Sequence, residues 1–225
     1  MPKNTNGPAR QVVGKSRHRK NVQARGEERR GQLIDAAREL LMEIPVEELT
    51  FGQIAAKAGV PEGSAYHFYA NKYDVLSSLA KELSVQFVES YKEPIDETTI
   101  RSWQDLADLV VDRTAAIYAV DLAAVQIFLS GRTPPEVVMV DRSSVRTVSA
   151  VLVDLFDRLF VLPDVPKIHN VFYYFVELTD LMLSLSVMEN GEITSEFLEE
   201  SKRAGKGYLG TYLPPVLTRR RKETD

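Results

Sequence analysis

The side chains of this sequence that are best suited to chemistry lie close together in one short segment. Gly63, Ser64, Tyr66 and His67 follow Glu62 in a stretch that has the period of a short helix. At 100° per residue, Gly63 and His67 point directly away from the apolar stripe of that helix. A hydroxyl, an imidazole and open backbone suit hydrogen bonds to phosphate oxygens and base edges. The pattern predicts a surface that contacts nucleic acid; the alternative is that Tyr66 and His67 only cover a small helical core.

Two helices and a turn must position these side chains. Thr50 followed by Gln53 forms a capping box, which predicts a helix start, and Gly59 is suited to end that helix. Asn71 is a good N-cap for the helix that follows the polar segment, with Asp74 three residues further on. The order is that of a helix-turn-helix, in which the second helix lies in the major groove of DNA.

Two basic features flank this segment. Lys72 stands in the first turn of a predicted helix, where the helix dipole disfavours a cation unless a phosphate binds there as well. Residues 1–25 contain seven Lys/Arg and no acid, and Arg25 is the last of these cations before the first predicted helix. Such an arm could lie along the minor groove or the DNA backbone. The alternatives are a solvated lysine and an idle tail.

The same residues carry a resemblance to a known family. The motifs are Ile34-x-Ala36-Ala37, Thr50-x-x-x-Ile54-Ala55-x-x-Ala58-Gly59-Val60 and Gly63-Ser64-x-Tyr66-x-x-Tyr69-x-Asn71-Lys72. In order and spacing, the stretch from Arg30 to Leu76 resembles the N-terminal domain of the TetR family of transcriptional regulators. The resemblance implies a homodimer that binds a double-stranded DNA operator. It also implies a helical C-terminal domain that binds a small-molecule effector, and release of the operator when the effector binds.

The resemblance also assigns roles to individual residues. Those at phosphate-contact positions are Thr50, Tyr66, His67 and Lys72. Those at positions that read bases are Glu62, Gly63 and Ser64. Pro61 departs from the usual Ser/Thr cap of the recognition helix, which loses a hydrogen bond worth ~1 kcal/mol, and Tyr69 stands where phenylalanine is usual. Glu62 would repel phosphate unless it accepts a hydrogen bond from a cytosine amino group.

The composition bounds the class of protein. The chain has 225 residues, 44% of them hydrophobic, and no cysteine, which excludes disulfides, thiolate metal sites and cysteine nucleophiles. Residues 1–80 contain 12 Lys/Arg and 9 Asp/Glu, whereas residues 81–225 contain 16 Lys/Arg and 23 Asp/Glu. A basic N-terminal part on an acidic body favours a polyanion partner for the N-terminus alone. No secretory signal and no uncharged apolar stretch of membrane-spanning length is recognisable, so we expect a cytoplasmic protein that does not enter a membrane.

The whole chain is expected to be all-α, with about nine helices. We predict a disordered basic arm over residues 1–26 and a helix-turn-helix DNA-binding domain over 27–76. A ligand-binding and dimerisation domain is predicted over 77–213, followed by a basic tail over 214–225.

The C-terminal part indicates architecture more than chemistry. No metal-ligand spacing, nucleophile motif or phosphate-binding glycine loop is recognisable, so no cofactor, metal or enzyme activity is predicted. A ligand pocket is expected among the helices over residues 103–118, 122–129 and 135–160. Its candidate lining residues are Trp103, Tyr118, Phe128, Met139, Arg146, Phe156 and Tyr174. The alternative is plain core for the aromatic residues and the solvent face for Arg146.

The segment from Pro166 to Glu189 is apolar nearly all round, so it needs packing partners on more than one side. With Thr194–Tyr212, it is expected to form a four-helix interface with a second copy of the chain. Glu177 and Asp180 are out of place there, because buried acids need partners. They are expected to pair with cations of the last helix, which are Lys202, Arg203 and Lys206. The alternative is that one acid faces the ligand pocket and selects a cation or a hydrogen-bond donor.

The sequence thus favours a ligand-responsive DNA-binding transcriptional regulator, and in particular a repressor. One alternative is a helical small-molecule-binding protein or enzyme whose helix-turn-helix has lost DNA binding. Pro61 and Glu62 are the residues that favour this alternative. Another is an architectural DNA-binding protein with a filled C-terminal core.

Overall fold

All the secondary-structure elements that the structure describes are helices. The computed structural model describes residues 13–220, without the side chains of residues 13–23 and 138–142. The elements are α1 (Val13–Leu41), α2 (Phe51–Lys57), α3 (Glu62–Ala65), α4 (Lys72–Lys92), α5 (Trp103–Val120), α6 (Leu122–Ala124), the π-helical turn η1 (Val125–Leu129), α7 (Pro135–Leu159), α8 (Ile168–Asn190) and α9 (Ser195–Leu209). The all-α prediction is confirmed, and the expected count of about nine is close because α6 and η1 divide one predicted helix.

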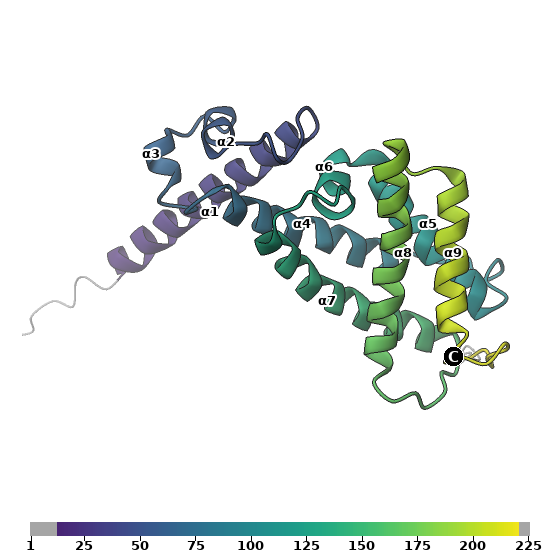
Figure 1. The fold of residues 1–225 in the computed structure, drawn as a ribbon. Coiled ribbons are helices and arrows are strands. Elements are labelled where there is room, and N and C mark those ends of the chain that lie inside the picture. The colour runs from purple at the N-terminus through teal and green to yellow at the C-terminus, as the bar shows by residue number, and fades with distance from the viewer. Residues whose placement is uncertain (1–12, 221–225) are drawn as a thin grey trace, which may run out of the picture.

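A small helical unit stands at one end of the molecule. Helices α1, α2 and α3 form this unit, and α4 leads from it into the larger body built from α5 to α9 (Figure 1). Leu33, Ala37 and Leu41 on one face of α1 are buried together with Ile54 and Ala55 of α2. Apolar residues at helical spacing thus supply the core of the unit.

Helix α4 belongs to both parts of the molecule. Asn71 caps it, its side-chain oxygen accepting hydrogen bonds from the backbone N–H groups of Tyr73 at 2.8 Å and Asp74 at 3.1 Å. The helix then runs for 21 residues, with Leu76 buried near its start and Tyr91 buried near its end. The predicted boundary between residues 76 and 77 therefore falls inside one continuous helix.

The first helix begins earlier than we predicted. Residues 13–26, which we expected to belong to a disordered arm, form the first half of α1, and residues 1–12 lie outside the described part. Lysine, arginine, glutamine and alanine are good helix formers, so this segment can continue a helix without burying an apolar face.

Residues 214–220 of the predicted basic tail pack against the body. The indole N–H of Trp103 donates to the carbonyl of Pro214 at 2.9 Å, and the backbone N–H of Val161 donates to the carbonyl of Thr218 at 2.8 Å. Arg220 pairs with Asp157 at 2.5 Å. These contacts fix the C-terminal segment beside the ends of α5 and α7.

Helices α8 and α9 lie very close together. A Cβ atom on Gly205 of α9 would lie 2.6 Å from the ring of Phe175 and 2.9 Å from the methyl of Thr179, both on α8. The hydroxyl of Ser201 donates to the carbonyl of Thr179 at 3.0 Å. By length and apolar composition α8 could cross a membrane, but here Phe172 and Phe175 are buried in the core.

Candidate DNA-binding surface and effector cavity

The start of α2 is fixed by the capping box that the sequence predicts. The backbone N–H of Gln53 donates to the Thr50 hydroxyl at 3.2 Å, and the backbone N–H of Thr50 donates to Gln53 Oε1 at 2.7 Å. Gly59 follows with a φ of 65°, in the left-handed region that favours glycine. Thr50 therefore stands exposed at a rigid helix start, next to the turn that leads to α3.

Helix α3 is short and turns its polar residues outward. Ala65 is fully buried and anchors it, while Gly63, Ser64, Tyr66 and His67 are exposed. A Cβ atom on Gly63 would meet nothing within 4 Å, so its backbone is open to an approaching molecule. Pro61 occupies the N-cap position and makes no side-chain capping bond, as the sequence predicts.

Two side chains of this segment, those of Tyr66 and Glu62, lie against α2. The ring of Tyr66 lies 4.7 Å from that of Phe51, measured between centroids, although 53% of Tyr66 is exposed. Tyr66 thus covers part of the small core and also faces solvent. The carboxylate of Glu62 lies 3.3 Å from the position that a Cβ on Gly52 would take, in the first turn of α2. A carboxylate is stabilised there by the helix dipole, which explains how Glu62 is accommodated.

The lysine at the start of α4 is held rather than freely solvated. Lys72 Nζ donates to the carbonyl of Leu49 at 2.6 Å and lies 3.4 Å from that of Glu47. It also lies 5.6 Å from the centroid of the Tyr73 ring. Its charge is therefore fixed at the carbonyl of Leu49, the residue before Thr50.

Only part of the predicted basic arm can be followed. Arg25 is exposed on α1, whereas the side chains of Arg17, Arg19 and Lys20 lie outside the described part. Further along α1, Arg30 lies over the ring of Tyr69, 5.5 Å from its centroid.

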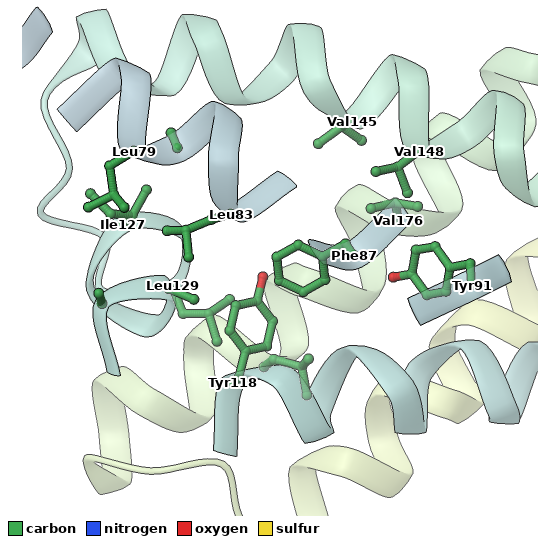
Figure 2. Packing of buried hydrophobic residues seen from close by; sticks show 14 of the residues in the cluster. Leu79, Leu83, Phe87, Tyr91, Tyr118, Ile127, Leu129, Val145, Val148 and Val176 are labelled. Atoms are coloured by element: carbon green, nitrogen blue, oxygen red, sulfur yellow. The ribbon is translucent and has the colours of Figure 1, made fainter. Parts of the chain in front are cut away.

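A small cavity lies inside the larger body. It has a volume of about 30 Å³ and is lined by residues of five elements: Ser84, Phe87, Tyr91, Thr114, Tyr118, Phe128, Val145, Val148, Val176 and Asp180. The ring of Phe87 lies 5.2 Å from that of Tyr118 and 5.9 Å from that of Phe128, between centroids. Figure 2 shows Phe87 and Tyr118 pointing toward one another from α4 and α5. The cavity is aromatic and carries one carboxylate.

One phenol of this cavity stays neutral. The hydroxyls of Tyr91 and Thr114 are hydrogen-bonded at 2.6 Å in a buried setting. Burial raises the pKa of Tyr91 far above its usual range, and the negative charge of Asp180 raises this pKa further. Tyr91 therefore lines the cavity as a neutral phenol and not as a phenolate.

A second hollow adjoins the cavity between η1, α7 and α8. It has a volume of about 190 Å³ and shares Phe128, Val145 and Asp180 with the cavity. Its other lining residues are Glu177, Leu181 and Ser184 of α8. We call this hollow the mouth, because it lies beside the cavity and opens toward the surface of α8.

The structure brings together two of the predicted pocket residues, Tyr118 and Phe128. The others lie elsewhere, apart from Met139, whose side chain is outside the described part. Trp103 and Phe156 are buried in the core, and Tyr174 is exposed on α8. Arg146 is exposed, 4.8 Å from the centroid of the Tyr173 ring, which corresponds to the solvent-face alternative.

The lining residues that sequence reasoning missed come chiefly from α4. Ser84, Phe87 and Tyr91 are spaced by three and four residues, so they lie on one face of that helix. This spacing is a signal that the sequence itself contains.

The cations of α9 form ion pairs with other acids than the two acids of α8 that we expected. Lys202 of α9 pairs with Asp112 at 2.7 Å, and Lys206 pairs with Asp108 at 2.8 Å, both acids lying on α5. Arg203 pairs with Glu200 of its own helix. Lys202 and Lys206 thus face α5, whereas Glu177 and Asp180 line the mouth.

The turn η1 joins the two parts of the molecule. The side-chain amide of Gln126 donates to the carbonyls of Leu41 at 2.9 Å and Ile44 at 2.8 Å, at the end of α1. Its oxygen accepts a hydrogen bond from the backbone N–H of Val46 at 2.8 Å. Two residues further on, Phe128 lines the cavity. One π-helical turn therefore contacts the helix-turn-helix unit and the cavity.

Ion pairs strengthen the same junction. Arg38 of α1 pairs with Asp121, whose carboxylate also caps α6. Glu47 pairs with Arg132 at 2.5 Å, just beyond η1.

A helix-turn-helix unit joined by one long helix to a helical body with an internal cavity defines a class of DNA-binding regulatory proteins. Residues 33–79 match the family described as bacterial regulatory proteins, tetR family. The match covers the last part of α1, the helix-turn-helix and the first part of α4.

Individual relatives show how far the similarity reaches. The fatty acid metabolism regulator protein of Bacillus subtilis (strain 168) is 42% identical over 66 residues, which are 29% of this chain and 34% of that protein. The match thus spans about a third of the length of that curated relative.

Solved structures extend the likeness of fold to most of the chain. A TetR-family transcriptional regulator from Streptomyces coelicolor superposes with a TM-score of 0.66 at 23% identity, over 82% of this chain and 99% of that one. The multidrug binding protein EbrR complexed with ethidium superposes with a TM-score of 0.59 at 17% identity, over 80% of this chain and 98% of that one.

Proposed function

We propose that this protein is a dimeric transcriptional repressor that leaves its DNA operator when a small molecule binds in the cavity. The observation that carries the proposal is the exposed face of α3, which α2 and α4 hold rigidly beside Thr50 and Lys72. Short helices with one polar face held in this way can enter a major groove, while the flanking groups bind phosphates.

We assign the residues of this surface to two kinds of DNA contact, to phosphates and to bases. Thr50, Tyr66, His67 and Lys72 are the proposed phosphate contacts, and Gly63 and Ser64 are the proposed base contacts. Glu62 leans toward Gly52, so we assign it a smaller role in reading bases. Arg25 would contact the DNA backbone from the exposed side of α1.

DNA binding is the first test of this function. DNA affinity is measured by fluorescence anisotropy on DNA from upstream of the protein's own gene. Tyr66→Ala is expected to weaken binding about tenfold, because a hydrogen bond to a charged group contributes roughly 1.5–3 kcal/mol. Tyr66→Phe keeps the ring on Phe51 and removes only the hydroxyl. Lys72→Ala is expected to weaken binding and to reduce the salt slope by about one.

Controls separate contact from stability. Lys81→Ala, also exposed on α4, is expected to leave both affinity and salt slope unchanged. Because Lys72 also holds the loop at Leu49, the thermal stability of each variant is measured alongside. Wild-type affinity in both Tyr66→Ala and Lys72→Ala would exclude the assigned surface, and a wild-type protein that binds ligands but no DNA would favour the non-DNA-binding alternative.

An apolar face on α8 and α9 supports the proposed dimer. Tyr174, Leu181 and Met188 follow one another at seven-residue spacing on α8 and are 51%, 50% and 61% exposed. On α9 and just beyond it, Tyr208 and Tyr212 stack with centroids 5.4 Å apart. A seven-residue apolar repeat on an exposed helix is suited to pack against a second helix. We propose that α8 and α9 of two copies form a four-helix interface.

The dimer has its own prediction. Leu181→Arg is expected to raise the dissociation constant of the dimer by at least about tenfold, because a large charged side chain would replace an apolar contact in the interface. Light scattering after gel filtration measures the change. Val85→Arg, which replaces a similarly exposed apolar residue of α4, is the matched control. Equal masses for the wild-type protein and the Leu181→Arg variant across the concentration range would rule out this interface.

The proposed response to an effector runs through η1. A cavity of about 30 Å³ is far smaller than an organic effector, so binding must displace the lining, including Phe128. Displacement of Phe128 moves the turn that also holds Gln126 against α1. A ligand that binds better to the displaced arrangement lowers DNA affinity by the same free-energy difference.

A further inference from the structure

A third hollow lies where the helix-turn-helix unit meets the larger body. It has a volume of about 490 Å³ and is lined by the loop after α1, by η1 with its flanking residues, and by the end of α8. Its apolar wall includes Leu122 and Met188, which are 43% and 61% exposed. Glu47 and Arg132, which form an ion pair at 2.5 Å, line it as well. We call this hollow the junction groove.

The exposure of its wall suits the junction groove to a protein surface more than to a small molecule. Binding pockets usually enclose about 70–90% of the surface of a small ligand. Leu122 and Met188 both face solvent, so a small molecule would remain partly in water here. Arg132 keeps most of its side chain exposed, and its five N–H donors can bind a second carboxylate beside that of Glu47. A partly apolar surface that carries acids would therefore complement the groove.

The corner between α8 and α9 is a surface of this kind. Residues 189–196 contain three exposed glutamates and no lysine or arginine, and Ile193 is half-buried among them. The fully buried Ser186 fixes the shape of the corner. Its hydroxyl donates to the carbonyl of Glu192 at 2.8 Å and accepts a hydrogen bond from the backbone N–H of Thr194 at 2.9 Å. A surface that is already ordered loses little conformational entropy on binding.

The symmetry of a dimer on DNA would bring the corner of one copy to the groove of the other. Two helix-turn-helix units must face the same duplex, so the two-fold axis leaves both of them on one side of the dimer. The corner lies at the end of the body that meets this unit, because Gly191 lines the junction groove, and Figure 1 shows it at the same end as α6. Met188 belongs both to the exposed apolar line of α8 and to the groove, so the proposed dimer face runs directly into the groove.

We propose that the corner of a second copy of this chain covers the junction groove, so that the partner holds each helix-turn-helix unit on its own body. Apolar contacts form at Leu122, and Glu192 of one copy approaches Arg132 of the other. This inference rests on the proposed dimer through α8 and α9. It adds a contact that couples association of the two copies to the order of the junction, where the backbone N–H of the buried Val46 donates to Gln126.

A substitution in the groove tests the contact. Leu122→Glu places an acid against the acidic corner and is expected to raise the dissociation constant of the dimer by at least about tenfold. Leu122 is exposed in the first turn of α6, where the helix dipole favours an acid, so the variant is expected to fold. Val120→Glu, which replaces an exposed apolar residue two positions earlier and outside the groove lining, is the matched control and should dimerise as the wild-type protein does. Analytical ultracentrifugation of the full-length proteins over a dilution series measures both.

A mixing experiment shows whether the contact crosses between copies. Glu192→Arg reverses one charge of the corner. When Leu122→Glu chains are mixed with Glu192→Arg chains, mixed dimers are expected several-fold above their statistical share, because one groove then meets a corner of opposite charge. Native mass spectrometry of chains with tags of different mass counts the dimers.

Amide exchange at Val46 tests the coupling to the junction. Exchange is expected to be several-fold faster in the Leu181→Arg variant, at concentrations where it is a monomer, than in the wild-type dimer, because the junction opens more often without its cover.

The outcomes separate this contact from the proposed dimer and from DNA binding. A wild-type dissociation constant for Leu122→Glu, or a statistical share of mixed dimers, overturns the inference and leaves the groove to another occupant such as a small molecule, while the α8–α9 dimer and operator binding stand. Equal exchange at Val46 in monomer and dimer also overturns it. A wild-type protein that is monomeric at every concentration contradicts the proposed dimer as well.

Discussion

Gly205→Ala is expected to destabilise the protein by up to about 2 kcal/mol, because forcing an extra group into a packed core usually costs about 1–3 kcal/mol. The added Cβ would lie 2.6 Å from Phe175 and 2.9 Å from Thr179, so α8 and α9 must separate or the Phe175 ring must move. The gain in helix propensity, about 1 kcal/mol for glycine to alanine, offsets only part of this cost. Urea unfolding followed by circular dichroism measures the net change.

Gly207→Ala is the matched control for this prediction. It lies on the same helix, is exposed, and an added Cβ would meet nothing within 4 Å. The variant should gain up to about 1 kcal/mol from helix propensity alone. The two alanine variants are thus expected to shift stability in opposite directions. Stabilisation by both substitutions would show that α8 and α9 do not approach as closely as described.

The second prediction concerns the junction at η1. Gln126→Ala removes three hydrogen bonds to the backbone at the end of α1. Each partly buried backbone group left without a partner costs roughly 1–3 kcal/mol, less where water replaces the amide. We expect faster amide exchange at Val46 and several-fold weaker DNA binding, because two recognition helices must stay about 34–36 Å apart to meet successive major grooves.

The control for Gln126→Ala is Gln104→Ala on α5. Gln104 donates to the carbonyl of Pro215, far along the chain from the helix-turn-helix unit. Exchange at Val46 and DNA affinity should be those of the wild-type protein. If Gln126→Ala behaves like Gln104→Ala in both measurements, the amide of Gln126 does not hold the two parts together.

The helix-turn-helix unit could be predicted from the sequence because its signals are local. The capping box at Thr50, the turn at Gly59 and the N-cap at Asn71 each depend on residues within a few positions, and all three are found. The bond from Lys72 to Leu49 could not be predicted in this way, because it depends on how the loop after α1 folds back onto α4.

The residues that line the cavity were less predictable, because the type of a residue does not determine whether its side chain faces the cavity or the core. Trp103 and Phe156 have the same aromatic chemistry as Phe87, but packing places them in the core and Phe87 beside the cavity. The partners of Lys202 and Lys206 depend in turn on which helix α9 meets. That helix is α5, which lies about a hundred residues earlier in the chain.

The length of α4 has a mechanical consequence. At 1.5 Å per residue, its 21 residues span about 31 Å, from Lys72 beside the DNA-binding surface to the turn that carries Tyr91 beside the cavity. A rigid rod of that length converts a tilt of about 5° at one end into a displacement of nearly 3 Å at the other. An expansion of the cavity that tilts α4 by about this angle would therefore shift the helix-turn-helix unit by the rise of about two helical residues.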